Sequence, residues 1–213
     1  MGGFIEAFHE GGIWMYLILV LGVFSVSIFL ERVVYLFGKA SVDKDRFLAN
    51  VQRAILAGDL NSAVNYCSER SAPLTNIVRQ GLIAVMNKGK EDEVQTAMDV
   101  ASLREVPLIE RRTSFLPLFA NIATLLGLLA TIVAMINAFK SVAAVDPSQK
   151  ATMLSGAISE AMFGTAGGLI VAIPSLLAYA FLASKTQRIL DDIHEVSVAT
   201  LNLILQNREK FSK

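Results

Sequence analysis

Three side chains in the apolar stretches of this sequence could bind or transfer protons. Glu160 stands at the start of an uncharged run, 161–184, and Thr165 follows it within that run. Thr131 lies inside a second uncharged run, 113–139. A carboxylate inside an apolar segment is costly and usually functional, as a proton relay or a charge partner. The alternatives stay open: Glu160 could reach outward to water, and the threonines could simply bond their own backbone.

No enzyme signature accompanies these residues. The glycines of GTAGG lie inside an apolar stretch with no following Lys, which argues against a phosphate-binding loop. The sequence has no HExxH or CxxC pattern, and its single cysteine, Cys67, excludes a disulfide within one chain. A formal net charge of zero argues against nucleic-acid binding. The sequence therefore predicts no catalytic residue, no metal site and no cofactor.

The composition is that of a membrane protein. Hydrophobic residues make up 54% of the chain and charged residues only 18%, whereas a soluble domain usually carries about 25% charge. The missing charge is concentrated in three runs, 11–30, 113–139 and 161–184. Each run is about 20 residues or longer, enough at 1.5 Å per residue to cross a hydrocarbon core of about 30 Å. We therefore predict an all-α integral membrane protein with three transmembrane helices.

The placement of Lys and Arg predicts the orientation of these spans. The first twelve residues contain no Lys or Arg, 38–115 contains eleven, the connector between the second and third spans has two, and the tail after 184 has five. The segment rich in Lys and Arg should face inward. The predicted order is an outer N-terminus (1–12), a first span (13–37), an inner helical region (38–113), a second span (114–140), an outer connector (141–154), a third span (155–184) and an inner C-terminal helix (185–213).

The inner region is predicted to be helical. Its four helices are expected to start at the cap or turn residues Asp43, Asp59, Pro73 and Glu91. We expect the fourth helix to run past Pro107 directly into the second span, because no glycine or loop cluster separates them. At the end of the first span, Glu31 and Arg32 are expected to lie in the inner headgroup region or to reach it.

Small residues recur at helical spacing on the second and third spans. The stripe on the second span comprises Ala120, Thr124, Gly127, Thr131, Ala134 and Ala138. The stripe on the third comprises Ala157, Ala161, Gly164, Thr165, Gly168, Ala172 and Ser175. Such stripes allow helices to approach closely. We assign Gly127, Gly164, Gly168 and Pro174 to helix packing, Pro174 by bending the third span. Counted along an antiparallel pair, Thr131 and Thr165 lie at similar depths, about 14 and 15 Å.

At these residues the chain resembles a known family. GLLATIVAMINAF (127–139) and ISEAMFGTAGGLIVAIPSLLAY (158–179) are similar to the MotA/TolQ/ExbB proton-channel family, in its TolQ/ExbB branch. AGDLNSAVNYCSERSAPLTNIVRQGL (57–82) and the Glu31–Arg32 pair resemble that branch as well. The chain departs from the family pattern at Ala130, where a glycine is usual, and at Gly164, where an alanine is usual. Neither departure removes a polar group.

The resemblance implies a proton-driven motor subunit of the bacterial inner membrane, with the outer side of the chain in the periplasm. It also implies a homo-oligomeric ring, usually of five copies, around single-span partners of the TolR/ExbD type that carry a membrane aspartate. This chain has no Asp in any predicted span, so it could not supply that proton carrier. Thr131 and Thr165 would then hydrogen-bond the partner's carboxyl or line its proton path, with Glu160 near the outer mouth. A competing hypothesis is a non-conducting scaffold that holds another membrane complex through its small-residue faces.

Overall fold

The computed structural model describes residues 12–142 and 146–208. They belong to two compact units, the membrane unit (1–31 and 112–181) and the bundle unit (32–111 and 182–213). Most of the predicted outer N-terminus, three residues of the predicted connector and the last five residues of the predicted C-terminal helix lie outside the described residues. Each unit is treated below by itself.

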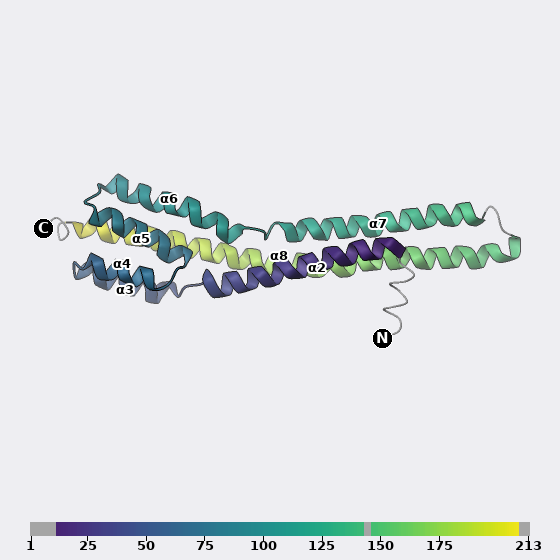
Figure 1. Ribbon diagram of the computed structural model, residues 1–213, viewed down its shortest axis with the longest axis horizontal. Coiled ribbons are helices and arrows are strands. Elements are labelled where there is room, and N and C mark those ends of the chain that lie inside the picture. The colour runs from purple at the N-terminus through teal and green to yellow at the C-terminus, as the bar shows by residue number, and fades with distance from the viewer. Residues whose placement is uncertain (1–11, 143–145, 209–213) are drawn as a thin grey trace. The chain divides into compact units, whose positions relative to one another are not determined.

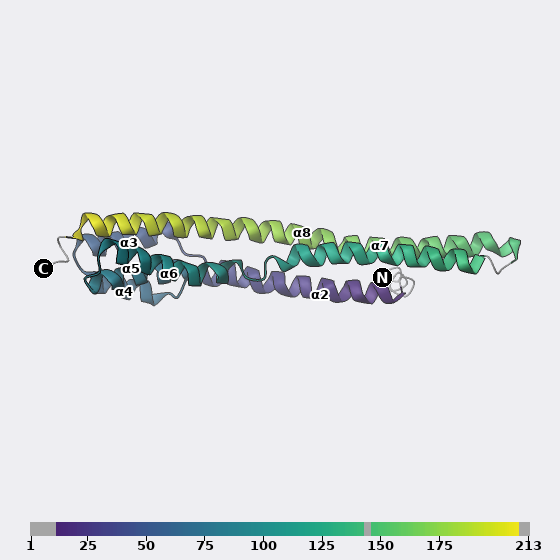
Figure 2. The same ribbon diagram turned by 90° about the horizontal axis from the view of Figure 1, so that it is seen from above.

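Every regular element in the described ranges is helical (Figures 1 and 2). The elements are α2 (Gly12–Val34), the π-helix η1 (Tyr35–Lys39), α3 (Lys44–Leu56), α4 (Leu60–Glu69), α5 (Pro73–Met86), α6 (Glu91–Glu110), α7 (Phe115–Val142) and α8 (Pro147–Gln206). The stretches that contain α2, α7 and α8 are long and apolar enough to cross a membrane. The predicted all-α class with three spans is therefore confirmed.

The bundle unit is built from short capped helices. The Asp43 side chain accepts the Arg46 amide at 3.2 Å and begins α3, and Asp59 accepts the Ser62 amide at 3.0 Å and begins α4. Both satisfy an amide that has no partner inside its own helix. Gly58, at φ +77°, terminates α3 in the left-handed region that glycine adopts without strain. These local signals explain why the predicted helix starts were accurate here.

The core of the bundle unit forms where these helices pack on the C-terminal part of α8. Phe47 of α3 stacks on Tyr66 of α4 with ring centroids 5.8 Å apart. Lys44 binds Glu195 of α8 at 2.7 Å. Cys67 is buried in this core, and burial raises the pKa of its thiol to about 12. The cysteine is thus a small core residue rather than a nucleophile.

The predicted continuous helix from α6 into α7 is wrong. α6 ends at Glu110, α7 begins at Phe115, and Arg112 between them has a left-handed backbone at φ +64°. Arg32 gives a physical reason for the break. Its buried guanidinium donates to the carbonyls of Leu108 and Ile109 in the last turn of α6. Those carbonyls lack helical partners once the helix stops, so the side chain of a distant residue stabilises this helix end.

The same contacts hold the Arg32 side chain inside the bundle unit. Its side chain is only 3% exposed, and its guanidinium carbon lies 4.8 Å from the centroid of the Tyr35 ring. The side chain is therefore buried against protein, and its expected place at the level of the inner headgroups stays a prediction. Its neighbour Glu31, in the membrane unit, is about half exposed and forms an ion pair with Arg112 at 2.6 Å.

In the membrane unit, α7 lies antiparallel to the first part of α8 (Figures 1 and 2). Both helices extend further than predicted: α7 continues to Val142 and α8 begins at Pro147, so most of the predicted connector is helical. α8 then continues without interruption through Pro174. The third helix of the unit, α2, contacts α7 through Phe24 and Phe119, whose ring centroids are 6.4 Å apart.

Candidate proton-transfer site

The site is built on close contact between the backbones of α7 and α8. A Cβ atom added to Gly127 would lie 3.0 Å from the Gly164 carbonyl oxygen and 3.2 Å from the Thr165 Cα. A Cβ added to Gly168 would lie 2.6 Å from the carbonyl oxygen of Ala123. Neither glycine therefore has room for a side chain. We call this contact the α7–α8 seam, and its glycines bring the two backbones close enough for polar groups on both helices to meet.

Thr165 crosses the α7–α8 seam. Its hydroxyl donates to the Gly127 carbonyl oxygen at 3.4 Å, which is long for a hydrogen bond between these atoms. In the helical pattern the same carbonyl accepts the amide of Thr131, four residues further along α7. The Gly127 carbonyl thus connects the Thr165 hydroxyl to the backbone of Thr131.

Thr131 itself does not face α8. Its hydroxyl donates to the Leu128 carbonyl of its own helix at 2.6 Å, and its side chain is only partly buried. It follows Gly127 by four residues, so its Cα lies about 6 Å further along α7 than the Gly127 Cα, which Thr165 contacts. The two threonines are therefore close in depth, but the chain alone does not bring their hydroxyls together.

The predicted stripe on α7 is consequently rotated from the observed one. The small residues buried on α7 are Ala120, Ala123, Gly127, Ala130 and Ala138. Thr124 and Thr131 belong to the edge of this face, and Thr124 is exposed with its hydroxyl bonded to the Ala120 carbonyl at 3.0 Å. This edge is left uncovered by the rest of the described chain, so it is available to another molecule.

Glu160 lies on a different side of α8 from Thr165. Five residues of α-helix rotate a side chain by about 140°, so the two cannot share a face. The Glu160 side chain is exposed, and its Oε1 atom is 4.0 Å from the position of a Cβ built on Gly12, at the start of α2. The structure therefore places Glu160 at the end of the contact between α2 and α8, apart from the α7–α8 seam.

Two further residues complete the comparison with the sequence-based assignment. Pro174 is exposed and does not lie in the α7–α8 seam. Ser175, part of the predicted stripe, instead hydrogen-bonds Ser25 of α2, Oγ to Oγ, at 2.6 Å, and both residues are buried. Ser25 was not anticipated, although a serine in an apolar run is a signal for an interhelical hydrogen bond.

Chemically, the α7–α8 seam offers hydroxyls and carbonyls in an apolar setting. Such groups can hold a carboxyl or pass a proton along, but they do not store one at neutral pH. The residues that form the seam carry no charge, so a proton carrier would have to come from another molecule. Because the surroundings of the seam are apolar, each hydrogen bond made in it is electrostatically stronger than in water.

Comparison with known proteins agrees with this chemistry. The family model for the MotA/TolQ/ExbB proton channel family matches residues 69–195, more than half of the chain. This chain belongs to that family. The matched range, 69–195, includes the whole α7–α8 seam. The family match indicates a proton-channel protein.

The curated relatives are named for the ExbB and TolQ branch of the family. A protein from Methanothermobacter thermautotrophicus that is named as an ExbB homologue, ExbB being a biopolymer transport protein, is 27% identical to this chain over 199 residues. The match covers 92% of this chain and 68% of that protein. The Tol-Pal system protein TolQ of Haemophilus influenzae is 35% identical over 98 residues, 45% of this chain and 42% of that protein. The biopolymer transport protein ExbB of Neisseria gonorrhoeae is 28% identical over 160 residues, 67% and 72% of the two chains.

A solved structure shares the fold. C. jejuni MotAB superposes with a TM-score of 0.54, covering 98% of this chain and 89% of that chain, at 13% identity. At this identity the likeness supports the helical architecture alone.

Proposed function

We propose that this protein is the channel subunit of an inner-membrane motor that uses the proton motive force to drive a single-span partner. The partner would be of the TolR/ExbD type and would carry a membrane aspartate. The observation that supports this most directly is the Thr165 hydroxyl at the Gly127 carbonyl, inside an uncharged seam. A carboxyl brought to this level by another helix would find donors and acceptors, and little competition from water.

The uncovered edge of α7 suggests how the partner is accommodated. Thr131 and Thr124 lie along this edge, and several copies of the chain arranged in a ring, with five as our expectation, would turn their edges toward a common space. The partner's aspartate would move past Thr131 and Thr165, and Glu160 would serve near the outer mouth on the α2 side. Each proton that crosses 100 mV supplies about 2.3 kcal/mol, which is enough to bias a two-state movement of the partner.

The orientation is part of the proposal: a periplasmic N-terminus, cytoplasmic residues 38–113 and a cytoplasmic C-terminus. Cysteines placed at two exposed sites, Ser148 of α8 and Gln52 of α3, would test it. In cells with a permeable outer membrane, an impermeant thiol reagent should label S148C and leave Q52C unlabelled. The reverse pattern would contradict the proposed orientation.

The decisive test removes the hydroxyls of the proposed path. T131V and T165V are near-isosteric changes that delete the hydroxyl, and T165S keeps it. T152V supplies the matched control, since Thr152 is an exposed threonine on the same helix as Thr165, outside the α7–α8 seam. We expect T131V and T165V to lose proton flux at parental membrane levels, while T165S and T152V retain it.

The same experiment separates the proposal from a non-conducting scaffold. A scaffold would lose one interhelical bond in T165V, worth about 0.6 kcal/mol on average, and would otherwise behave like the parent. Full activity in both valine variants would therefore rule out the proposed proton path. Activity lost together with assembly, equally in T165S, would point to a packing role for Thr165 instead.

A further inference from the structure

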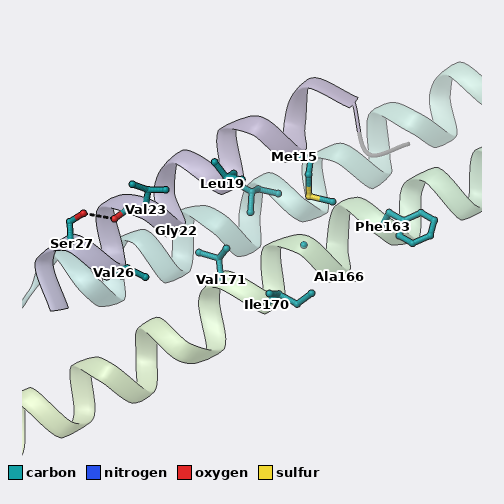
Figure 3. Close-up of a pocket in the computed structure, with 12 residues that line it drawn as sticks. Met15, Leu19, Gly22, Val23, Val26, Ser27, Phe163, Ala166, Ile170 and Val171 are labelled. Carbon is teal, nitrogen blue, oxygen red and sulfur yellow. Dashed lines mark hydrogen bonds between the residues drawn. The ribbon is translucent and has the colours of Figure 1, made fainter. Parts of the chain in front are cut away.

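A second feature of the membrane unit lies away from the α7–α8 seam. A groove of about 450 Å³ runs between α2 and α8, on the side of these helices away from α7 (Figure 3). Met15 and Phe163 line one end, and Val26 and Ser27 line the other. A second groove of about 510 Å³ shares residues with the first, including Gly22, and continues toward Phe29 and Phe181. Together they form one continuous trough, which we call the α2–α8 groove.

The lining of the α2–α8 groove offers a ligand no charged group, and its serine hydroxyls already use their hydrogens in bonds within the protein. No charged residue lines either part. The Ser27 hydroxyl donates to the Val23 carbonyl of its own helix at 2.7 Å, a bond visible in Figure 3. In the second part, Ser25 and Ser175 bond each other. An occupant that brought polar groups into the trough would leave them unpaired, which is costly in an apolar setting.

The glycines of the groove are not accessible for packing by a third helix. A Cβ on Gly22 would lie 3.2 Å from the Val171 side chain, and a Cβ on Gly167 would lie 2.6 Å from the Met15 sulfur. These glycines are thus already used for contact between α2 and α8. A helix with its side chains is about 10–12 Å across, and it packs closely only where small residues are open to it. The groove fits a narrower, flexible occupant.

The length and the charge of the groove point to a lipid. From Met15 to Phe29 it follows fourteen residues of α2, about 21 Å, against a hydrocarbon core of about 30 Å. One turn beyond its Met15–Phe163 end lies the Glu160 carboxylate, beside Gly12. An uncharged trough with a carboxylate at its mouth complements an acyl chain that carries a cationic group at its head.

We propose that the α2–α8 groove binds one acyl chain of a phosphatidylethanolamine from the surrounding bilayer, with the lipid ammonium at Glu160. An anionic headgroup would place its phosphate near this carboxylate without a compensating cation, so phosphatidylglycerol should bind less well. Lipid bound here would hold α2 against α8. The acyl-chain site lies on the opposite side of α8 from Thr165, so it shares only Glu160 with the proposed proton path, and lipid retention can be measured separately from proton flux.

Native mass spectrometry of the full-length protein tests the proposal, after exchange into an equal mixture of phosphatidylethanolamine and phosphatidylglycerol. Ala166 is an exposed groove residue, so A166F fills the trough with an aromatic ring. Ala180 is an exposed alanine on the same helix outside the groove, and A180F is the matched control. We expect the parent and A180F to retain phosphatidylethanolamine. The fraction of protein that carries this lipid should be at least tenfold lower in A166F.

E160Q is a second test variant, which removes the charge of Glu160 with an isosteric side chain and does not disturb packing. It should reduce the preference for phosphatidylethanolamine over phosphatidylglycerol severalfold while keeping an acyl chain in the groove. A parent that retains no lipid, or equal retention by A166F and A180F, would overturn the proposal. A smaller oligomer in A166F with unchanged lipid would overturn it too, since the groove would then be covered by a second copy of the chain. An unchanged headgroup preference in E160Q would refute the role of Glu160.

Discussion

Adding one methyl group at Gly168 tests the geometry of the α7–α8 seam. In G168A the new Cβ would lie 2.6 Å from the Ala123 carbonyl oxygen, about 0.8 Å short of the 3.4 Å at which ordinary contact begins. The obstructing atom belongs to the backbone of α7 and cannot rotate away. The helices must therefore separate, or the carbonyl must tilt out of its helical hydrogen bond.

The magnitude follows from two opposing terms. Overpacking of this kind costs about 1–3 kcal/mol, and a rigid backbone neighbour favours the upper part of that range. Alanine is better than glycine inside a helix by about 1 kcal/mol, so G168A should be destabilised by about 1–2 kcal/mol overall. G156A provides the matched control, because Gly156 is in the same helix and a Cβ there would meet no neighbouring atom within 4 Å. Only the higher helix propensity of alanine then contributes, so the free energy of unfolding of G156A should rise by up to about 1 kcal/mol.

The two variants should therefore differ by about 2–3 kcal/mol. For a chain of this length, 1 kcal/mol moves the melting temperature by about 2–4 °C, so thermal unfolding in one detergent should separate them by roughly 5–10 °C. Proton flux should fall in G168A alone, because separating the helices lengthens the Thr165–Gly127 hydrogen bond. Equal melting temperatures would refute the close backbone contact, and a stabilised G168A would show that the helices do not meet at this level.

Three further outcomes follow from other contacts. R32M should lower the free energy of unfolding by about 2 kcal/mol, because hydrogen bonds from charged groups contribute about 1.5–3 kcal/mol; a melting temperature equal to that of the parent would mean that Arg32 does not cap α6. E31R and R112E should each lose up to about 1 kcal/mol, the range for exposed ion pairs, and the double variant should recover most of that loss in a double-mutant cycle; simple additivity would exclude the pair. Cys67, with its pKa raised to about 12 by burial, should react with a thiol reagent at pH 8 far more slowly in the native protein than after denaturation, and its reaction should accelerate only as the pH rises toward that value; equal rates would contradict its burial.

The sequence was sufficient for the features that depend on composition and local signals. Uncharged runs of bilayer length predicted the three spans, and the caps Asp43 and Asp59 predicted two helix starts to the residue. The small residues around Gly127 and Gly164 identified the right pair of helices. In each case the physical cause lies within a few residues of the feature, so the local sequence is enough to predict it.

The errors occurred where the cause is distant in the sequence. Nothing near residues 111–114 indicates a helix break, because Arg32, some 76 residues earlier, stabilises the helix end there. The stripe on α7 was placed on the Thr124–Thr131 edge rather than on Ala123 and Ala130, since helical spacing defines a face but not the side that packs. The separation of Glu160 from Thr165, by contrast, could have been predicted from their spacing of five residues.

The weakness of the Thr165 hydrogen bond is what suits it to a transfer site. At 3.4 Å the hydroxyl gains little from the Gly127 carbonyl, and that carbonyl keeps the Thr131 amide as its helical partner when the hydroxyl turns away. The hydroxyl can therefore leave for a carboxyl on another helix without stranding a buried acceptor, the usual cost of breaking such a bond. The contact that the hydroxyl would gain is a stronger one, since hydrogen bonds to charged groups are about twice as strong as neutral ones. The glycines hold the two backbones close together, and the Thr165–Gly127 hydrogen bond across the seam remains easy to exchange.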